Sequence, residues 1–211
     1  MNLSGTFNAF RLLREPSICL PHHTIPTFEH LSLPLGADFA RRAGQSKPSI
    51  KAVVLDKDNC FAIPHTNEIY PPYKAKFEEL RKAYPGRRLL IVSNTAGTLS
   101  DPGNREAEEL EKNTGVHVLR HAVKKPGCHQ EVLDYFRKNP EAQVTSPAEI
   151  AVVGDRLLTD MMLANMMGSY GVYVRDGVTS ERSIFSSMEL RLSAFLQKRG
   201  VVAPHPVSDF E

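Results

Sequence analysis

The sequence predicts an α/β protein built on a doubly wound parallel sheet. Short apolar runs rich in β-branched residues alternate along the chain with segments of helical pattern. This alternation is typical of strand–helix–strand units joined by right-handed crossovers. The runs lack the polar alternation of a half-exposed strand, so we expect helices to cover both faces of the sheet. The expected strands are residues 52–55, 89–92, 116–119, 150–153 and 170–174.

Helices are expected between and after these strands. The segment that opens at Lys125-Pro126 can begin a helix, because proline is tolerated in the first turn. An amphipathic helix near residues 187–198 closes the predicted domain, which spans residues 49–200. Residues 201–211 show no pattern and are expected to form a loose tail. The other expected helices lie near residues 73–83, 104–113 and 157–167.

The overall composition excludes several classes of protein. A formal net charge of +2 over 211 residues is too small to indicate nucleic-acid binding by bulk electrostatics. The three cysteines, Cys19, Cys60 and Cys128, are odd in number and widely spaced, which does not predict a disulfide framework or a zinc site. The sequence contains no run of about 18 apolar residues, so no transmembrane helix is expected.

Residues 1–48 differ from the rest and are expected to form an N-terminal extension. Its start has apolar residues at helical spacing, and Pro16 should end that helix. Further prolines then indicate an extended strap rather than a continuous helix. Three interpretations remain open: packing on the domain or on another subunit, attachment to a membrane interface, and a targeting peptide. The residues concerned are Leu3, Phe7, Phe10 and Leu13 in the helix and prolines 21, 26 and 34 in the strap.

Polar clusters follow four of the predicted strands. In an open parallel sheet, the carboxyl ends of the strands form the edge at which ligands bind. Asp56 and Asp58 lie two positions apart, so in extended backbone their side chains would point the same way. Like charges held that close require a cation or a shared proton. The clusters are Asp56-Lys57-Asp58-Asn59, Ser93-Asn94, Lys125-Pro126 and Gly154-Asp155-Arg156-Leu157-Leu158-Thr159-Asp160.

The order of these clusters resembles the haloacid dehalogenase (HAD) superfamily of phosphotransferases, over roughly residues 50–176. Three stretches are similar to the mitochondrial phosphatidylglycerophosphate (PGP) phosphatases, a family of the cardiolipin pathway. They are residues 51–60, 92–97 and 152–160. Cys60 departs from the superfamily pattern, which usually has Thr or Val there. Cysteine is small and commonly buried, so packing at this position can be retained.

The resemblance implies a role for each polar residue in phosphoryl transfer. Asp56 would attack phosphorus and form an aspartyl-phosphate intermediate. Asp58 would protonate the leaving alkoxide and then accept a proton from the hydrolytic water. Lys125 would stabilise the charge that develops in the transition state. Ser93, together with Asn94, would hold the transferred phosphoryl oxygens.

The resemblance also implies a hard divalent cation, Mg²⁺, in the site. Its protein ligands would be the carboxylates of Asp56 and Asp155 and the backbone carbonyl of Asp58. Asp160 would orient Lys125 or a water on the metal. Basic residues near these motifs could hold a second phosphate of the substrate. The candidates for this contact are Lys57, Lys124 and Arg156.

The spacing of the motifs predicts an essentially capless site. About 33 residues separate Asn59 from Ser93, and about 30 separate Asn94 from Lys125. Each gap must hold a helix, and the second also a strand, so neither has room for a folded cap. An uncovered site suits a bulky substrate such as a protein, a nucleic acid or a lipid headgroup.

The expected function is Mg²⁺-dependent hydrolysis of PGP to phosphatidylglycerol in cardiolipin biosynthesis. The resemblance implies a peripheral protein at the matrix face of the mitochondrial inner membrane, with a phospholipid substrate and no nucleic-acid partner. A homo-oligomer is one alternative for its assembly. Two other functions stay open: a capless HAD phosphatase for protein phosphoesters or soluble sugar phosphates, and an inactive binding protein on the same fold.

Overall fold

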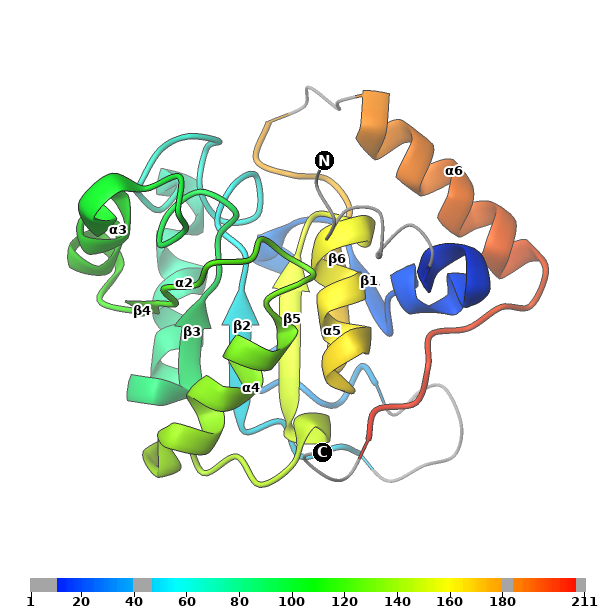
Figure 1. Cartoon of the computed structure of the whole chain (residues 1–211), viewed down its shortest axis with the longest axis horizontal. Helices are drawn as coiled ribbons and strands as arrows, with labels where there is room; N and C mark the ends of the chain where they lie inside the picture. The colour runs from blue at the N-terminus through cyan, green and yellow to red at the C-terminus, as the bar shows by residue number, and fades with distance from the viewer. Residues whose placement is uncertain (1–10, 40–46, 180–183, 208–211) are drawn as a thin grey trace.

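Six parallel strands form one sheet in the order β1-β6-β5-β2-β3-β4 (Figure 1). The structure, a computed structural model, describes residues 11–39, 47–179 and 184–207. All pairs of neighbouring strands run parallel, which confirms the predicted fold class. The strands are β1 (His23–Ile25), β2 (Ala52–Leu55), β3 (Leu89–Ile91), β4 (His117–Val118), β5 (Ile150–Gly154) and β6 (Tyr170–Val174).

The chain reverses its direction of travel across the sheet between β2 and β5. From β2 it proceeds outward to β3 and β4, and it then returns to place β5 and β6 on the other side of β2. Leu55 pairs with Val153, and the backbone N–H of Asp56 donates to the Val153 carbonyl at 2.9 Å. This topological switch point leaves a crevice at the carboxyl ends of two adjacent strands, which is where α/β folds bind ligands.

Helices cover both faces of the sheet. Side chains of α2 (Lys74–Ala83) and α3 (Arg105–Thr114) pack on one face. Those of α4 (His129–Lys138) and α5 (Met162–Met167) pack on the other, which faces the viewer in Figure 1. The last helix, α6 (Ile184–Lys198), lies outside α5. Short 3₁₀ turns occupy Pro16–Cys19, Phe28–His30, Pro71–Tyr73, Gly86–Arg88, Pro102–Asn104, Pro140–Ala142 and Pro147–Glu149, and a π-helical turn occupies Leu157–Met161.

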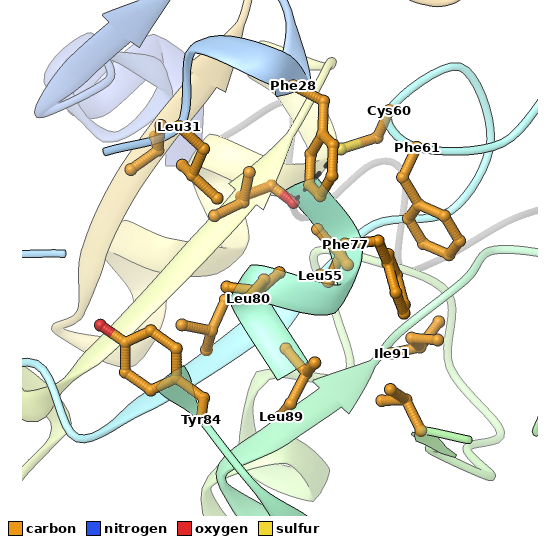
Figure 2. Packing of buried hydrophobic residues seen from close by; sticks show 14 of the residues in the cluster. Phe28, Leu31, Leu55, Cys60, Phe61, Phe77, Leu80, Tyr84, Leu89 and Ile91 are labelled. Atoms are coloured by element: carbon orange, nitrogen blue, oxygen red, sulfur yellow. Dashed lines mark hydrogen bonds between the residues drawn. The ribbon is translucent and has the colours of Figure 1, made fainter. Parts of the chain in front are cut away.

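The N-terminal strap packs on the domain and supplies the edge strand β1. Phe28 is fully buried, and Figure 2 shows it beside Phe61 and Phe77 in the core on the α2 face. The expectation of five strands was therefore short by one. Residues 23–25 are His, Thr and Ile, and these three positions neither alternate nor form an apolar run, so they carry no recognisable strand pattern. The apolar residues Leu3, Phe7 and Phe10 lie outside the described residues, and their attachment to a membrane stays a prediction.

Two further expectations require correction. The helix expected to open at Lys125-Pro126 begins at His129, and Pro126 lies in the preceding turn after a cis peptide bond. The tail is not loose between residues 201 and 207. The N–H of Val207 donates to the Gly168 carbonyl at 3.0 Å, and the N–H of Ala148 donates to the Val207 carbonyl at 3.1 Å. These bonds fix the tail against the loops at the ends of α5 and β5.

None of the helices in the described part of the chain combines the length and the apolar character that crossing a bilayer requires. The segments that separate the polar clusters fold as α2, α3 and β4 with their loops. Residues 59–125 are all described, and they contain no inserted cap domain.

Candidate active site

Four buried or half-buried charged side chains meet at the switch point. Asp56 follows β2, Asp155 follows β5, Lys125 comes from the turn before α4, and Asp160 lies in the π-helical turn. They lie at or beside a cavity of about 400 Å³ at the carboxyl edge of the sheet. The residues around it are Asp56, Asp58, Asn59, Pro64, His65, Asn94, Thr95, Lys125, Asp155, Arg156, Thr159 and Thr179.

Lys125 bridges two carboxylates. Its Nζ donates to Asp160 Oδ1 at 2.7 Å and also to Asp56 Oδ1. Its side chain is almost fully buried, which alone would lower its pKa, but Asp160 and Asp56 together raise the pKa above the ordinary value. The ammonium group is therefore held in its charged form directly beside Asp56, as the predicted role requires.

Asp56 is a buried carboxyl among like charges. Burial raises its pKa well above the ordinary range, Lys125 opposes that rise, and Asp160 and Asp155 add to it. The pKa of Asp155 is raised to about 7, first by burial and then by the charge of Asp160. One ammonium group thus faces three carboxylates, which leaves the cluster short of positive charge.

The same carboxylates fit a divalent cation. Oxygens of Asp56, Asp155 and Asp160 lie within 4.8 Å of one another. Both oxygens of Asp160 have protein partners, because Oδ1 accepts from Lys125 and Oδ2 accepts from the N–H of Arg156 at 3.1 Å. By contrast, Asp155 Oδ1 is buried and has no hydrogen-bond partner among the described residues. A buried carboxylate oxygen in that state is a natural ligand for a hard cation such as Mg²⁺.

Asn59, which sequence reasoning did not assign, orders one wall of the cavity. It adopts a left-handed backbone conformation with φ of 60°, which Asn tolerates better than most residues. Its Nδ2 donates to Asp155 Oδ2 at 2.9 Å, and its Oδ1 accepts from the N–H and the hydroxyl of Thr179. A Cβ at Gly177 would lie 2.0 Å from the Asn59 amide, so this approach requires glycine. The sequence feature that could have indicated this role of Asn59 is the turn-forming stretch Asp-X-Asp-Asn.

Asp58 lies at the cavity, but Lys57 does not. Asp58 Oδ1 accepts from the N–H of His65 at 2.8 Å, and Oδ2 accepts from the Thr95 hydroxyl at 3.4 Å. Lys57 is 1% exposed, and its Nζ donates to the Thr66 carbonyl and pairs with Asp58 Oδ1, both at 2.8 Å. The structure thus places the Lys57 ammonium group away from the cavity lining, and its role in substrate binding stays a prediction. Its ammonium group supports the Asp58 turn from beneath.

Ser93 and Asn94 follow β3 as predicted but differ in exposure. Ser93 is fully buried, and its hydroxyl lies 3.0 Å from that of Thr95. Thr95 and Asn94 line the cavity. Asn94 Oδ1 accepts from the N–H of Lys125 at 2.7 Å, which fixes the turn that carries the catalytic candidate. Contact of Ser93 with phosphate stays a prediction. The hydroxyl beside it that belongs to a cavity-lining residue is that of Thr95.

The π-helical turn delivers Asp160 to the cluster. The N–H groups of Asp160 and Met161 both reach the Arg156 carbonyl, and such widened turns occur often at functional sites. A Cβ at Gly154 would lie 2.4 Å from the Asp160 carboxyl, so glycine is needed where β5 ends. The predicted contact of Asp160 with Lys125 is present. Arg156 lies at the cavity wall with 49% of its side chain exposed.

Cys60 packs beneath the site. It is fully buried, and burial raises its thiol pKa well above the ordinary value. A thiol in that state is unreactive.

The fold and the site together define a class of enzyme. A buried carboxylate, an ammonium group beside it and carboxylate oxygens close enough to hold a cation meet in one cavity, and this combination suits phosphoryl transfer. We therefore assign the chain to the α/β enzymes that act on phosphate esters.

Comparison with known proteins identifies the family. A family model described as mitochondrial PGP phosphatase matches residues 3–179. The mitochondrial phosphatidylglycerophosphatase GEP4 of Saccharomyces cerevisiae is 52% identical over 93% of this chain and 99% of its own length. A probable mitochondrial phosphatidylglycerophosphatase of Schizosaccharomyces pombe is 33% identical over 94% of this chain and 92% of its own. The chain belongs to the mitochondrial PGP phosphatase family and is an enzyme of the phosphatase class, which confirms the resemblance found in the sequence.

Proposed function

We propose that this protein hydrolyses the terminal phosphomonoester of PGP to phosphatidylglycerol in mitochondria, at the matrix face of the inner membrane. The observation that supports the chemistry is the contact of Lys125 with both Asp56 and Asp160 in an uncovered cavity. The two relatives described above are named for this lipid and this organelle. On the basis of these names, we assign the lipid substrate and the mitochondrial location to the present chain.

The first step transfers the phosphoryl group to Asp56. A carboxylate oxygen of Asp56 attacks phosphorus, the bond between phosphorus and the ester oxygen breaks, and an aspartyl phosphate forms. Lys125 balances the charge on the phosphoryl oxygens. Asp58, as general acid, gives a proton to the departing glycerol oxygen, so that an alcohol leaves rather than an alkoxide. Thr95 and Asn94 bind the phosphoryl group from the β3 side.

The second step regenerates the enzyme. Asp58, now a carboxylate, accepts a proton from water while the water oxygen attacks phosphorus. The bond between phosphorus and the Asp56 oxygen breaks, which releases inorganic phosphate and restores the carboxylate. Asp56 and Asp155, with the Asp58 carbonyl, would hold Mg²⁺, which supplies further positive charge to the phosphoryl oxygens. Asp160 keeps Lys125 in position throughout.

A phosphate-release assay on the purified full chain tests the function. We expect hydrolysis of PGP in mixed micelles to need Mg²⁺ and to stop when EDTA removes it. Glucose 6-phosphate and a phosphoserine peptide should react at least about tenfold more slowly. Equal rates with and without EDTA would show that hydrolysis does not need Mg²⁺. Faster phosphate release from the peptide or the sugar phosphate would show that one of these compounds, and not the lipid, is the preferred substrate.

Arg156 is expected to select the lipid headgroup. PGP carries a phosphodiester beside the monoester that is cleaved, and Arg156 is the exposed cation on the cavity wall. Its change to Ala should lower kcat/KM for PGP roughly tenfold or more, through loss of a charge-assisted hydrogen bond. Turnover of para-nitrophenyl phosphate, which lacks the diester, should stay unchanged.

The matched control for Arg156 is Lys124→Ala, because Lys124 is exposed and lies next to Lys125 without lining the cavity. This variant should retain activity on both substrates. An equal loss on both substrates in Arg156→Ala would show that Arg156 has no special contact with the headgroup.

A further inference from the structure

One side of α6 presents large apolar side chains together with cations. Met188 is 60% exposed and Phe195 is 52% exposed, and they stand seven positions apart, so they lie on one side of the helix. Arg191 and Lys198 are exposed at positions that share this side, and Arg199, which directly follows the helix, is exposed beside Phe195. We call these five residues the α6 face. The guanidinium of Arg199 lies 4.3 Å from the centre of the Phe195 ring, which places a cation directly at the apolar surface.

The charge on this side of α6 has a single sign. Residues 184–202 contain one acidic residue, Glu189, and it is 4% exposed and turned into the protein. Glu189 accepts from the N–H of Leu157 at 3.0 Å and lies 4.0 Å from the Arg156 guanidinium. It therefore joins α6 to the loop that forms the wall of the active-site cavity. The first half of α6 therefore lies beside the loop that carries Arg156.

The first described helical turn extends the same surface. Residues 11–14 are helical and lie beside α6, where Leu12 packs on a cluster that contains Leu192 and Leu196 (Figure 1). Leu13, in this turn, is 82% exposed. Two further exposed cations, Arg11 and Arg14, flank it.

These features match an anionic bilayer better than a second copy of the chain. A helix with apolar and basic residues together on its outer side binds at the boundary between headgroups and acyl chains. Anionic headgroups attract each nearby Lys or Arg. If two copies met through this face about a two-fold axis, the cations of one would oppose those of the other, and such like-charge contact is costly.

We propose that the α6 face rests on a bilayer rich in anionic phospholipid, with Met188 and Phe195 entering the headgroup boundary. The inference rests on the proposed function, because that function places the substrate in a bilayer. Through Glu189, contact at α6 holds the cavity wall that carries Arg156 at the depth of the phosphate groups. The face is distinct from the cavity itself, so docking and chemistry can be altered separately.

Vesicle co-sedimentation of the full chain tests the proposal. The vesicles contain phosphatidylglycerol and phosphatidylcholine in equal amounts and no PGP, so binding is measured without turnover. The double variant Arg191→Gln/Lys198→Gln should bind roughly 30-fold more weakly. Met188→Ser/Phe195→Ser should bind at least roughly tenfold more weakly. Binding by the unaltered protein should fall with rising salt and on phosphatidylcholine alone.

The matched control is Lys82→Gln/Lys138→Gln, which removes two exposed cations from the last turns of α2 and α4. These turns precede β3 and β5 and so lie at the opposite edge of the sheet from the cavity. The control should bind vesicles as the unaltered protein does, and all variants should hydrolyse para-nitrophenyl phosphate normally.

Unchanged vesicle binding by both α6 variants would overturn the proposal. A change of sedimentation mass in these variants, without a change in vesicle binding, would instead make the face an interface between copies and would also overturn it. Hydrolysis of PGP in detergent micelles separates this inference from the proposed function. A protein that binds vesicles through α6 but never cleaves PGP would contradict the function alone.

Discussion

Asp56→Asn is expected to abolish phosphate release, with a fall in kcat on the order of 10³-fold or more. The amide has nearly the shape of the carboxylate but cannot form an acyl phosphate by attack on phosphorus. The substitution also removes one of three carboxylates that crowd a single ammonium group. We therefore expect the unfolding midpoint in metal-free buffer to be equal to or higher than that of the unaltered protein. Phosphate release and thermal unfolding measure the two effects.

The control for this prediction is Asp134→Asn on α4, because Asp134 is about half exposed and pairs with Arg137 far from the cavity. It should keep full activity. Activity of Asp56→Asn above a few per cent of the unaltered rate would contradict covalent catalysis by this residue. A large fall in its unfolding midpoint would mean that lost activity reports lost structure.

Phe28→Ala is expected to lower the free energy of unfolding by about 3–5 kcal/mol. Phe28 is fully buried, and its ring centre lies 5.6 Å from that of Tyr73 and 6.3 Å from that of Phe61. Truncation removes this apolar area and leaves a cavity in the core on the α2 face. Unfolding in urea measures the loss.

Glu29→Ala is the matched control, since Glu29 is the neighbouring residue and is exposed. Its effect should stay within about 0.5 kcal/mol. A loss below about 1 kcal/mol in Phe28→Ala would show that the strap folds apart from the domain. The same packing has a practical consequence, because removal of residues 1–36 would also remove β1 and Phe28. Such a truncated chain cannot report on membrane attachment alone.

The central strands and the acidic positions could be predicted because both depend on local pattern. A strand buried on both faces reads as a continuous apolar run, and the polar residue that follows it lies at the ligand-binding edge by topology alone. For this reason the sequence alone predicts that Asp56, Asp155 and Lys125 lie in one site. Strand β1 could not be predicted from local pattern, because its three residues are stabilised by pairing with β6, a partner almost 150 positions away in sequence.

The side-chain roles that were missed depend on contacts distant in sequence. The sequence favours an exposed Lys57, because lysine is rarely buried. The carbonyl of Thr66, in a loop whose path the sequence does not show, draws its ammonium group beneath the site. Asn59 gains its role from Asp155 and Thr179, which approach it only after the sheet has assembled. Local pattern carries no information on such approaches.

Chemical trapping of the acyl phosphate tests the central claim, that Asp56 carries the phosphoryl group during turnover. The enzyme is mixed with PGP and Mg²⁺, quenched in acid within one turnover, and treated with borohydride, which reduces an acyl phosphate to an alcohol. Mass spectrometry of the digested protein should find the reduced side chain at Asp56 and at no other carboxylate. Reduction at Asp155 or Asp160, or no reduction while phosphate is released, would contradict the account.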